Sequence, residues 1–565
     1  MSNPIREAKD DLDHIVWRAY ERAVSEGILP PGAGNTAVEP PRDPSHGDWA
    51  SSFALKNAKA LGMPPRTVAE AVAARAVLDG SYFCSLTVAG AGFLNARLSD
   101  RWFASVLRAV VSQGSSYGCA DTPREHPKRV MVEFVSANPT GPMTTGNARG
   151  GVLGDSLASV LKMAGFDVWR EFYLNDAGHQ VDLFGKSLEA RYLQALGQDS
   201  PFPEDGYHGD YITDFARAFV QREGDRLLSL PERERRRELV DFALPQNIAK
   251  MEADLKRYRI SYDRWFAESS LYENGEVAQT VEQLTRRGAT FEKDGALWFK
   301  ASDFGGEKDE VLIKSNGFYT YYAVDIAYHR DKFLTRGFDT VVNIWGADHH
   351  GHVRRMEAAM SALGIDPARL KIVLMQMVRF TRDGETVKMS KRTGQAITLA
   401  DLLDEISVDA ARFFFNQRQA NAHLEFDLGL AVRQDPDNPV YYVQYAHARI
   451  TSLFDILSRE GFDLSGSDAV TADLTLLREV AEREIIKALA CYPEEIRLAA
   501  RDLDPSRINR YAIDLASAFH RFYNAHRIKG ADRPLAEARL QLSAAVRQVL
   551  RNALAVLGVD APEDM

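Results

Sequence analysis

The stretch MVEFVSANPTGPMTTGNARGGVLGD, residues 131–155, decides the fold. It opens as a short apolar run with β-branched residues and stops in the chain breakers from Asn138 to Pro142. A helix-like stretch follows at Gly151 to Met163, and a second strand candidate lies at Asp167 to Tyr173. Strand, glycine- and proline-rich turn, helix and strand make a βαβ unit, the building block of a parallel sheet with a nucleotide crevice.

The turn in this unit is suited to an anion. Its glycines at 141, 146, 150 and 151 let a polyanion approach the backbone, and the following helix directs its free N–H groups to the same point. Taken alone, this richness in glycine fits a tight connection as well as a phosphate site. The turn is neither a Walker loop nor a G-x-G-x-x-G dinucleotide fingerprint.

Outward from this unit, the sheet pattern returns between Val311 and Thr398 and then gives way to helical periodicity. We therefore expect a multidomain α/β protein. Its predicted parts are an N-terminal α+β module at 1–115, a Rossmann-like parallel-sheet domain at 116–400 with a mostly helical insertion at about 178–270, and a C-terminal all-α helical bundle at 401–565. The insertion carries the run PERERRREL, whose arginines fit either RNA contact or, more commonly, a solvated helix face.

Composition and charge exclude several classes of protein. The 565 residues are 45% hydrophobic and 26% charged, which is typical of a globular protein. No apolar run reaches the roughly 18 residues of a membrane-spanning helix, and the segment from Met1 to Asp13 has no apolar signal-peptide core. Three distant cysteines argue against a disulfide framework, so we expect a cytoplasmic protein. The net charge of −10 excludes a uniformly basic nucleic-acid coat but not a basic groove.

A second chemical element lies far downstream, in DGETVKMSKRTGQAITL at 383–399. Here Lys388, Lys391 and Arg392 stand in a short loop with hydroxyl residues. Clustered cations suit a leaving pyrophosphate, whose charge grows in the transition state. An ordinary surface turn is the plainer interpretation, but the order Lys-Met-Ser-Lys is specific enough to favour the functional one.

The two elements together resemble the HIGH and KMSK signatures of class I aminoacyl-tRNA synthetases. The motifs VEFVSANPTGP, REFYLNDAGHQ, YYAVDIAYH, WGADHHGH and KMSKRTG are similar to those of bacterial-type arginyl-tRNA synthetases, and the resemblance covers essentially the whole chain. It implies a class I catalytic domain that activates L-arginine with ATP and Mg²⁺ and transfers it to the 3′-terminal adenosine of tRNA(Arg). We expect no tightly bound cofactor, no membrane partner and a monomer.

One element departs from the family pattern. Where the family usually has two histidines, this chain has Thr144-Thr145-Gly146-Asn147. Asparagine keeps a donor at the second position, whereas the shorter threonine would meet a phosphate through water. A catalytically impaired paralogue that binds tRNA without charging it therefore stays open as an alternative, as does a synthetase for another amino acid. The catalytic residues implied by the resemblance are Thr144, Asn147, Lys388 and Lys391.

A guanidinium substrate requires a carboxylate, because its planar fork of donors is matched by two oxygens. Tyr321 and Asp325 lie on one face if YYAVD starts a helix. Taken singly, a core tyrosine and an N-cap aspartate are the plainer interpretations. By resemblance, the arginine-binding residues are Glu133, Ser136, Asn138, Tyr321, Asp325 and Gln376.

The same resemblance places the segment WGADHHGH against the adenosine of ATP. Its histidines, His349, His350 and His352, also suggest zinc, but neither a cysteine nor a carboxylate motif accompanies them, and we expect no metal site. The ATP-binding residues implied are Pro139, Thr140, Gly141, Thr144, Gly146, Asn147, Gly346, Asp348, His349, Met377, Val378, Lys388, Met389, Ser390 and Lys391.

Aromatic residues flanked by arginine are concentrated in the predicted bundle, in YYVQYAHAR at 441–449 and HRFYNAHR at 520–527. Aromatic faces beside guanidinium groups suit unstacked RNA bases, although periodicity alone would place several of them in a core. The resemblance assigns the N-terminal module to the D-loop elbow of tRNA. It assigns Tyr442, Tyr445, Tyr523 and the terminal Met565 to the anticodon pocket.

Overall fold

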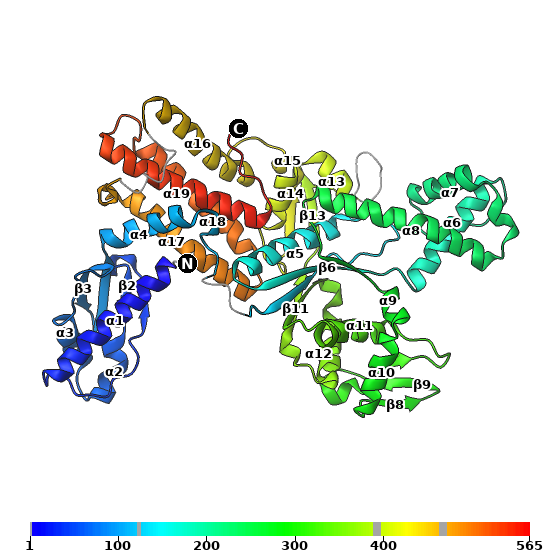
Figure 1. The fold of residues 1–565 in the computed structure, drawn as a ribbon, viewed down its shortest axis with the longest axis horizontal. Helices are drawn as coiled ribbons and strands as arrows, with labels where there is room; N and C mark the ends of the chain where they lie inside the picture. Colours follow the sequence, from blue (N-terminus) through cyan, green and yellow to red (C-terminus); the bar gives the residue numbers. More distant parts are fainter. Residues whose placement is uncertain (1–2, 121–125, 388–396, 463–471) are drawn as a thin grey trace.

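The protein is represented by a computed structural model that describes residues 3–120, 126–387, 397–462 and 472–565. It is elongated, with the central sheet in the middle (Figure 1). The N-terminal module and the C-terminal helices lie at one end, and the helical insertion lies at the other. Among the described residues, no helix combines the length and the apolar character needed to cross a membrane.

The central sheet is parallel, with strand order β12-β11-β5-β6-β7. The strands are β5 (Arg129–Glu133), β6 (Asp167–Leu174), β7 (Arg264–Ala267), β11 (Thr340–Gly346) and β12 (Leu370–Met375). The chain leaves β5 through α5 (Thr145–Met163) and returns as β6, whereas β11 pairs with the opposite side of β5. This reversal is a topological switch point, where open parallel sheets bind ligands beside the carboxyl ends of their strands. The predicted Rossmann-like sheet is confirmed.

Helix α5 packs very close to the sheet because of its glycines. A Cβ at Gly154 would lie 2.1 Å from Phe134, and one at Gly151 would lie 2.8 Å from Ile260. The helix begins at Thr145, earlier than the periodicity predicted, because Thr144 and Asn147 cap its first turn. Its N-terminus therefore lies directly at the glycine-rich turn.

The N-terminal module combines an antiparallel sheet of order β1-β2-β4-β3 with helices, as predicted. Its strands are β1 (Val38–Glu39), β2 (Trp49–Ser51), β3 (Phe83–Ala89) and β4 (Phe93–Leu98), and its helices are α1 (Pro4–Ser25), α2 (Phe53–Leu61) and α3 (Pro65–Ala73). The next helix, α4 (Asp100–Gln113), packs instead on the C-terminal helices, where Asp100 forms a 2.5 Å ion pair with Arg483.

The insertion after β6 contains α6 (His179–Ala195), α7 (Asp210–Glu223) and α8 (Glu232–Arg257). The predicted helical range of 178–270 also includes β7, which is a strand of the central sheet. Its 4 residues are too few to show alternation, and its partner β6 is distant in the sequence. Within the arginine run of α8, Arg235 and Arg236 bind Glu189 at 2.6 and 2.5 Å, which favours a structural role for that pair.

A second, smaller insertion separates β7 from β11. It contains α9 (Ser269–Glu273), α10 (Glu276–Arg286) and an antiparallel sheet of β8 (Thr290–Lys293), β9 (Ala296–Phe299) and β10 (Glu310–Ile313). Helix α11 (Tyr321–Arg330) follows and continues into the π-helical turn η5 (Asp331–Thr335). Thr320 caps α11 by accepting the Ala323 N–H at 3.3 Å, which makes YYAVDIAYH a helix. Helix α12 (His350–Leu363) connects β11 to β12.

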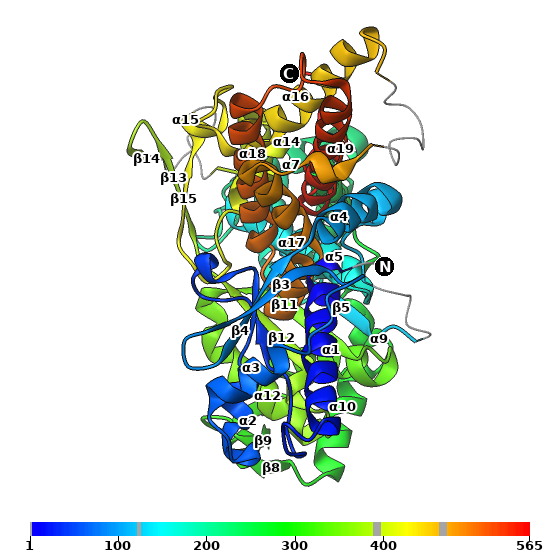
Figure 2. The ribbon, with the colours of Figure 1, turned by 90° about the vertical axis from the view of Figure 1, so that its left-hand side faces the viewer.

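Beyond β12, a small mixed sheet is formed by β13 (Val378–Arg382), β14 (Glu385–Val387) and β15 (Leu424–Asp427). Figure 2 shows these strands projecting to one side of the molecule. Between β14 and β15 lie α13 (Leu399–Glu405) and α14 (Val408–Phe415). The expectation that 401–565 is entirely helical is therefore wrong at β15. This strand of 4 residues forms only because β13, from the sheet domain, offers it a parallel partner.

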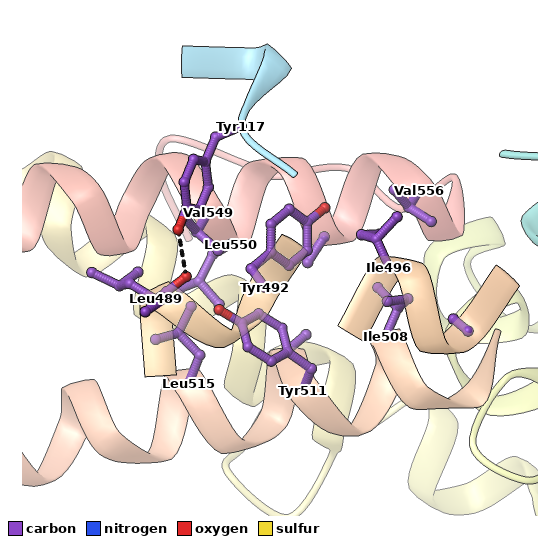
Figure 3. Packing of buried hydrophobic residues seen from close by; sticks show 14 of the residues in the cluster. Tyr117, Leu489, Tyr492, Ile496, Ile508, Tyr511, Leu515, Val549, Leu550 and Val556 are labelled. Carbon is purple, nitrogen blue, oxygen red and sulfur yellow. Dashed lines mark hydrogen bonds between the residues drawn. The ribbon is translucent and has the colours of Figure 1, made fainter. Parts of the chain in front are cut away.

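The C-terminal region is otherwise the predicted helical bundle. After the short α15 (Leu428–Ala431), it contains α16 (Pro439–Arg459), α17 (Val480–Asp502), α18 (Ser506–Ala525) and α19 (Arg533–Leu557). Figure 3 shows Tyr117, from the segment after α4, inserted into this bundle, where its hydroxyl donates to the Leu489 carbonyl at 2.9 Å. Tyr117 also stacks on Tyr492, with ring centroids 6.2 Å apart. The two ends of the chain therefore share one core.

Candidate active site

The glycine-rich turn after β5 is held in place by the helical insertion. The Tyr211 hydroxyl donates to the Thr140 carbonyl at 2.7 Å, and the Asn247 amide donates to the Pro139 carbonyl at 2.7 Å. A Cβ at Gly141 would lie 3.0 Å from the Tyr211 hydroxyl oxygen. The turn therefore has a fixed backbone, and its position depends on residues of α7 and α8 that carry no recognisable sequence signal.

The N-terminus of α5 presents the two residues that replace the expected histidines. The Thr144 N–H and hydroxyl both donate to the Asn147 amide oxygen, at 2.8 and 3.0 Å. Because Asn147 uses its oxygen for capping, its NH₂ group is left to donate elsewhere. Thr144 is exposed. Together with the free N–H groups of the helix end, this arrangement favours an anion.

The chain on the C-terminal side of the second element contacts the start of α5. Thr144 forms an isolated β-bridge with Thr398, and the Leu399 N–H donates to the Met143 carbonyl at 2.9 Å. The segment that follows the KMSK element therefore lies against the N-terminus of α5. Lys388, Met389, Ser390 and Lys391 themselves lie outside the described residues.

Tyr321 and Asp325 lie on the first turns of α11, near the carboxyl edge of the sheet. Tyr321 is 55% exposed, and its hydroxyl accepts the His179 N–H from the start of α6 at 3.2 Å. One Asp325 oxygen lies 3.0 Å from His352 Nε2. No lysine or arginine within the described part of the chain pairs with Asp325. Its carboxylate is thus oriented by a neighbour but not neutralised by a fixed cation.

A second carboxylate, Glu268, lies beside this pair and was not among the predicted residues. It is 3% exposed, and one of its oxygens accepts the Tyr173 hydroxyl at 2.8 Å. Its other oxygen is buried and, within the described residues, has no hydrogen-bond partner. Burial, with a smaller contribution from Asp325 and Asp176, raises the pKa of Glu268 to about 7. Its sequence context, AESS, gives no signal of this, because the signal is burial itself.

The predicted residues Glu133 and Ser136 lie at the end of β5 but bind each other. The Ser136 hydroxyl donates to one Glu133 oxygen at 2.9 Å and accepts the Tyr173 N–H at 3.2 Å. The other Glu133 oxygen is bound by the buried Lys332. Asn138 is exposed in the same turn. Ser136, rather than Glu133, is the group of this pair that is nearer the surface.

Gln376 follows β12 and is anchored through its backbone. Its N–H donates to the Ala420 carbonyl at 2.9 Å, and its carbonyl accepts Arg149 from α5 at 2.5 Å. Arg149 is fully buried and also binds the Gln419 and Ala422 carbonyls at 3.0 Å. Next to Gln376, Met377 is 78% exposed, and Val378 begins β13.

Of the adenosine candidates, Gly346 ends β11, which lies next to β5 in the sheet, and Asp348 and His349 follow it. His349 lies 3.5 Å from the exposed Asp348 carboxylate, whereas His352 turns to Asp325. Within the described residues, no group of three histidines, cysteines or acids could hold a metal ion. The histidines of this segment therefore serve different neighbours.

The aromatic residues of the C-terminal bundle form a stacked surface between α16 and α18. Tyr441 and Tyr445 are parallel within 6°, with centroids 6.1 Å apart, and Tyr445 stacks on His520 at 5.9 Å. The Arg449 guanidinium lies 4.1 Å from the Tyr523 ring centroid. Tyr442 packs on His520 at 4.6 Å, and Met565, at the chain end, is 50% exposed.

Three family models match the chain. One described as the catalytic domain of class I (R) tRNA synthetases covers residues 107–428. One described as the arginyl tRNA synthetase N terminal domain covers 12–98, and a DALR anticodon binding domain covers 443–565.

Known proteins are similar over the same extent. The chain is 51% identical over 566 residues to the arginine–tRNA ligase of Caldanaerobacter subterraneus subsp. tengcongensis, with 100% of both chains covered. It is 50% identical over 568 residues to that of Acetivibrio thermocellus, again with 100% of each covered. The solved arginyl-tRNA synthetase of Thermus thermophilus shares the fold, with a TM-score of 0.72 and 23% identity over 98% of this chain and 100% of that one.

Proposed function

The chain belongs to the class I arginyl-tRNA synthetases, and on that premise we propose that it activates L-arginine with ATP and transfers the arginyl group to tRNA(Arg). The arginine carboxylate attacks the α-phosphorus of ATP, which gives arginyl adenylate and pyrophosphate. The 3′-terminal adenosine of the tRNA then accepts the arginyl group. No covalent enzyme intermediate is required, so catalysis depends on alignment and on charge around the phosphates.

The ATP phosphates bind at the N-terminus of α5. The capped first turn supports this placement, because it presents free N–H groups and the Asn147 amide donor at the same point. Lys388 and Lys391 neutralise the leaving pyrophosphate, and Gly346, Asp348 and His349 contact the nucleoside. The contact of Thr144 with Thr398 supports this assignment, since the segment that follows the KMSK motif in the sequence reaches the same helix end.

The observation that carries the arginine assignment is a pair of carboxylates without a cation. The Asp325 carboxylate contributes to the raised pKa of Glu268, and neither acid forms an ion pair with lysine or arginine in the described part of the chain. A guanidinium complements such a pair, because it carries a positive charge and five N–H donors, whereas carboxylates are negative and only accept hydrogen bonds. Tyr321 closes the site from the surface, and Ser136, Asn138 and Gln376 hold the amino and carboxylate groups of the substrate.

The tRNA contacts two regions far from the sheet. The stacked surface of Tyr441, Tyr445 and His520, with Arg449 over Tyr445 and Tyr523, receives the bases of the anticodon, because aromatic rings beside a guanidinium suit unstacked bases. The N-terminal module binds the elbow. A recess of about 690 Å³ in that module, which includes Phe93 and Asn95, supports this role, since Phe93 is 41% exposed.

Mg²⁺ enters with ATP as part of the substrate. Magnesium often keeps several waters and binds through substrate phosphates with one or two carboxylates, so a full set of protein ligands is not required. We further propose that the enzyme acts as a monomer in the cytoplasm, where aminoacyl-tRNA is consumed.

ATP–pyrophosphate exchange and aminoacylation, with and without tRNA(Arg), test the proposal. Activity that requires arginine supports it. Activity with another amino acid would overturn the choice of substrate, and binding of tRNA without exchange or charging would overturn the catalytic assignment in favour of the impaired alternative. No observation in the described residues favours that alternative.

A further inference from the structure

A lysine is buried completely within the sheet domain. Lys332 lies in the π-helical turn η5 that extends α11, and its side chain is 0% exposed. Its ammonium binds a Glu133 oxygen, lies 3.2 Å from the Asn343 amide oxygen and lies 4.0 Å from the Tyr328 ring centroid. Turns of π-helix are uncommon and are frequently found at functional sites.

The position of Lys332 links neighbouring strands at the switch point. Glu133 and Asn343 are paired directly across β5 and β11, so one ammonium bridges the two strands between which the candidate site opens. On the far side, Asn343 donates to His329 at 2.8 Å, and His329 binds the Asp325 carbonyl at 2.8 Å. Lys332 is therefore at the centre of a network that reaches Glu133 on one side and the backbone of Asp325 on the other.

The contact to Glu133 has the most direct consequence for the substrate. With one oxygen held by Lys332, Glu133 presents the other to the Ser136 hydroxyl at 2.9 Å. Val135 and Ser136 have left-handed backbone angles, with φ of 70° and 44°. Such a conformation is costly for non-glycine residues and persists only where the surroundings hold it.

A buried ion pair is weak grounds for a role in stability, because well-packed apolar residues of similar volume are often as stable or more so. A role in positioning neighbouring groups accounts better for the buried charge of Lys332. We propose that Lys332 is a positioning residue that holds Glu133, and through it the Ser136 turn, in the geometry that receives the amino and carboxylate groups of arginine. The inference rests on the proposed function.

Four variants and the wild type test this role. Lys332→Met, Glu133→Gln and the double variant are compared in steady-state aminoacylation. We expect Lys332→Met to raise the arginine KM at least about tenfold while the ATP KM changes by less than about twofold. In the Glu133→Gln background, Lys332→Met should raise the arginine KM little further, because each substitution breaks the same Lys332–Glu133–Ser136 contacts. The matched control is the double variant Arg539→Met/Glu482→Gln. It removes a buried ion pair of 2.7 Å between α19 and α17, with side chains 9% and 0% exposed, and should leave the arginine KM unchanged.

Inhibition by ethylguanidine separates positioning from general damage. This fragment fills only the guanidinium end, so its Ki should stay within about twofold in Lys332→Met, while the arginine KM rises. Parallel losses for arginine and ethylguanidine would overturn the proposal, as would additive effects of Lys332→Met and Glu133→Gln. If Lys332→Met does not fold, the double variant Lys332→Met/Glu133→Gln, in which both charges are removed, decides. A wild-type arginine KM in this variant overturns the proposal. A raised arginine KM with a normal Ki for ethylguanidine supports it. Failure of the proposed function is distinct, since the wild type would then show no arginine-dependent activity.

Discussion

The carboxyl edge of the central sheet and the aromatic face of the C-terminal bundle differ in the interactions that they offer to the ligands we propose for them. At the sheet, Glu268 is 3% exposed and Asp325 has no lysine or arginine partner within the described residues, so the two acids proposed to bind arginine lack a fixed cation. At the bundle, Tyr445 is 37% exposed and already stacked on its neighbours, so the proposed RNA base would add one more ring to an existing stack. Substitutions at the acids should therefore change the KM of arginine strongly and in a pH-dependent way. Substitutions at the aromatic face should change the KM of tRNA more modestly.

The largest effect is expected at Asp325. Asp325→Asn keeps the shape of the side chain but removes the charge that we propose binds the guanidinium, and hydrogen bonds to charged groups contribute about 1.5–3 kcal/mol. We expect the arginine KM to rise by about 100-fold, with the ATP KM and the tRNA KM within about twofold of wild type. Steady-state aminoacylation with each substrate varied in turn measures this. A normal arginine KM would remove Asp325 from the site.

We expect the arginine KM to vary with pH as Glu268 titrates. Because burial raises its pKa to about 7, the folded protein keeps a proton on Glu268 that the unfolded chain releases above its ordinary value of 4.5. The free energy of unfolding that Glu268 contributes therefore falls as the pH rises through this window. Binding of a cation needs the ionised form, so the arginine KM should fall about tenfold from about pH 6 to about pH 8.

Glu268→Gln provides the control for this profile. It should raise the arginine KM at high pH and flatten its dependence on pH, while thermal unfolding becomes less sensitive to pH over the same range. If the arginine KM of Glu268→Gln still rose at low pH, the pH dependence would belong to another group.

A smaller effect is expected on the aromatic face. Tyr445→Ala removes a ring that stacks on Tyr441 and His520, and stacking contributes roughly 1–3 kcal/mol per base. We expect the tRNA KM to rise by about fivefold to tenfold and the arginine KM in pyrophosphate exchange at saturating tRNA to stay unchanged. Tyr445→Phe, which keeps the ring, is the matched control and should behave as wild type. A changed arginine KM in Tyr445→Ala would contradict the expectation that the two regions act on different ligands.

The smallest effect is expected at Thr144. Its N–H, which any residue retains, continues to donate to Asn147 after Thr144→His, and only the hydroxyl contact of 3.0 Å is lost. Histidine adds a donor toward the phosphates, so kcat should stay the same or rise by less than about threefold. Single-turnover adenylate formation measures this. A loss of more than about tenfold would show that the site has been rebuilt around threonine.

Much of the fold could be predicted because its signals are local. The run before Asn138 and the glycines of α5 predicted the βαβ unit, and the structure has it. The strands β7 and β15 could not be predicted, because each has 4 residues and gains its partner from a distant segment. The helix at Tyr321 was ambiguous for a related reason, since apolar composition fits either state and the Thr320 cap decides between them.

The sequence by itself determined the chemistry on offer: a glycine-rich turn before a helix, a lysine-rich loop, acids for a guanidinium and aromatic residues beside arginines. Only the tertiary structure decided which charges are free to act. Glu133 and Asp325 both carry a carboxylate, but a buried lysine pairs with the first, whereas within the described residues the second has a histidine as its partner. Burial and pairing are properties of segments brought together from across the chain, and the free energy of a charge depends on both.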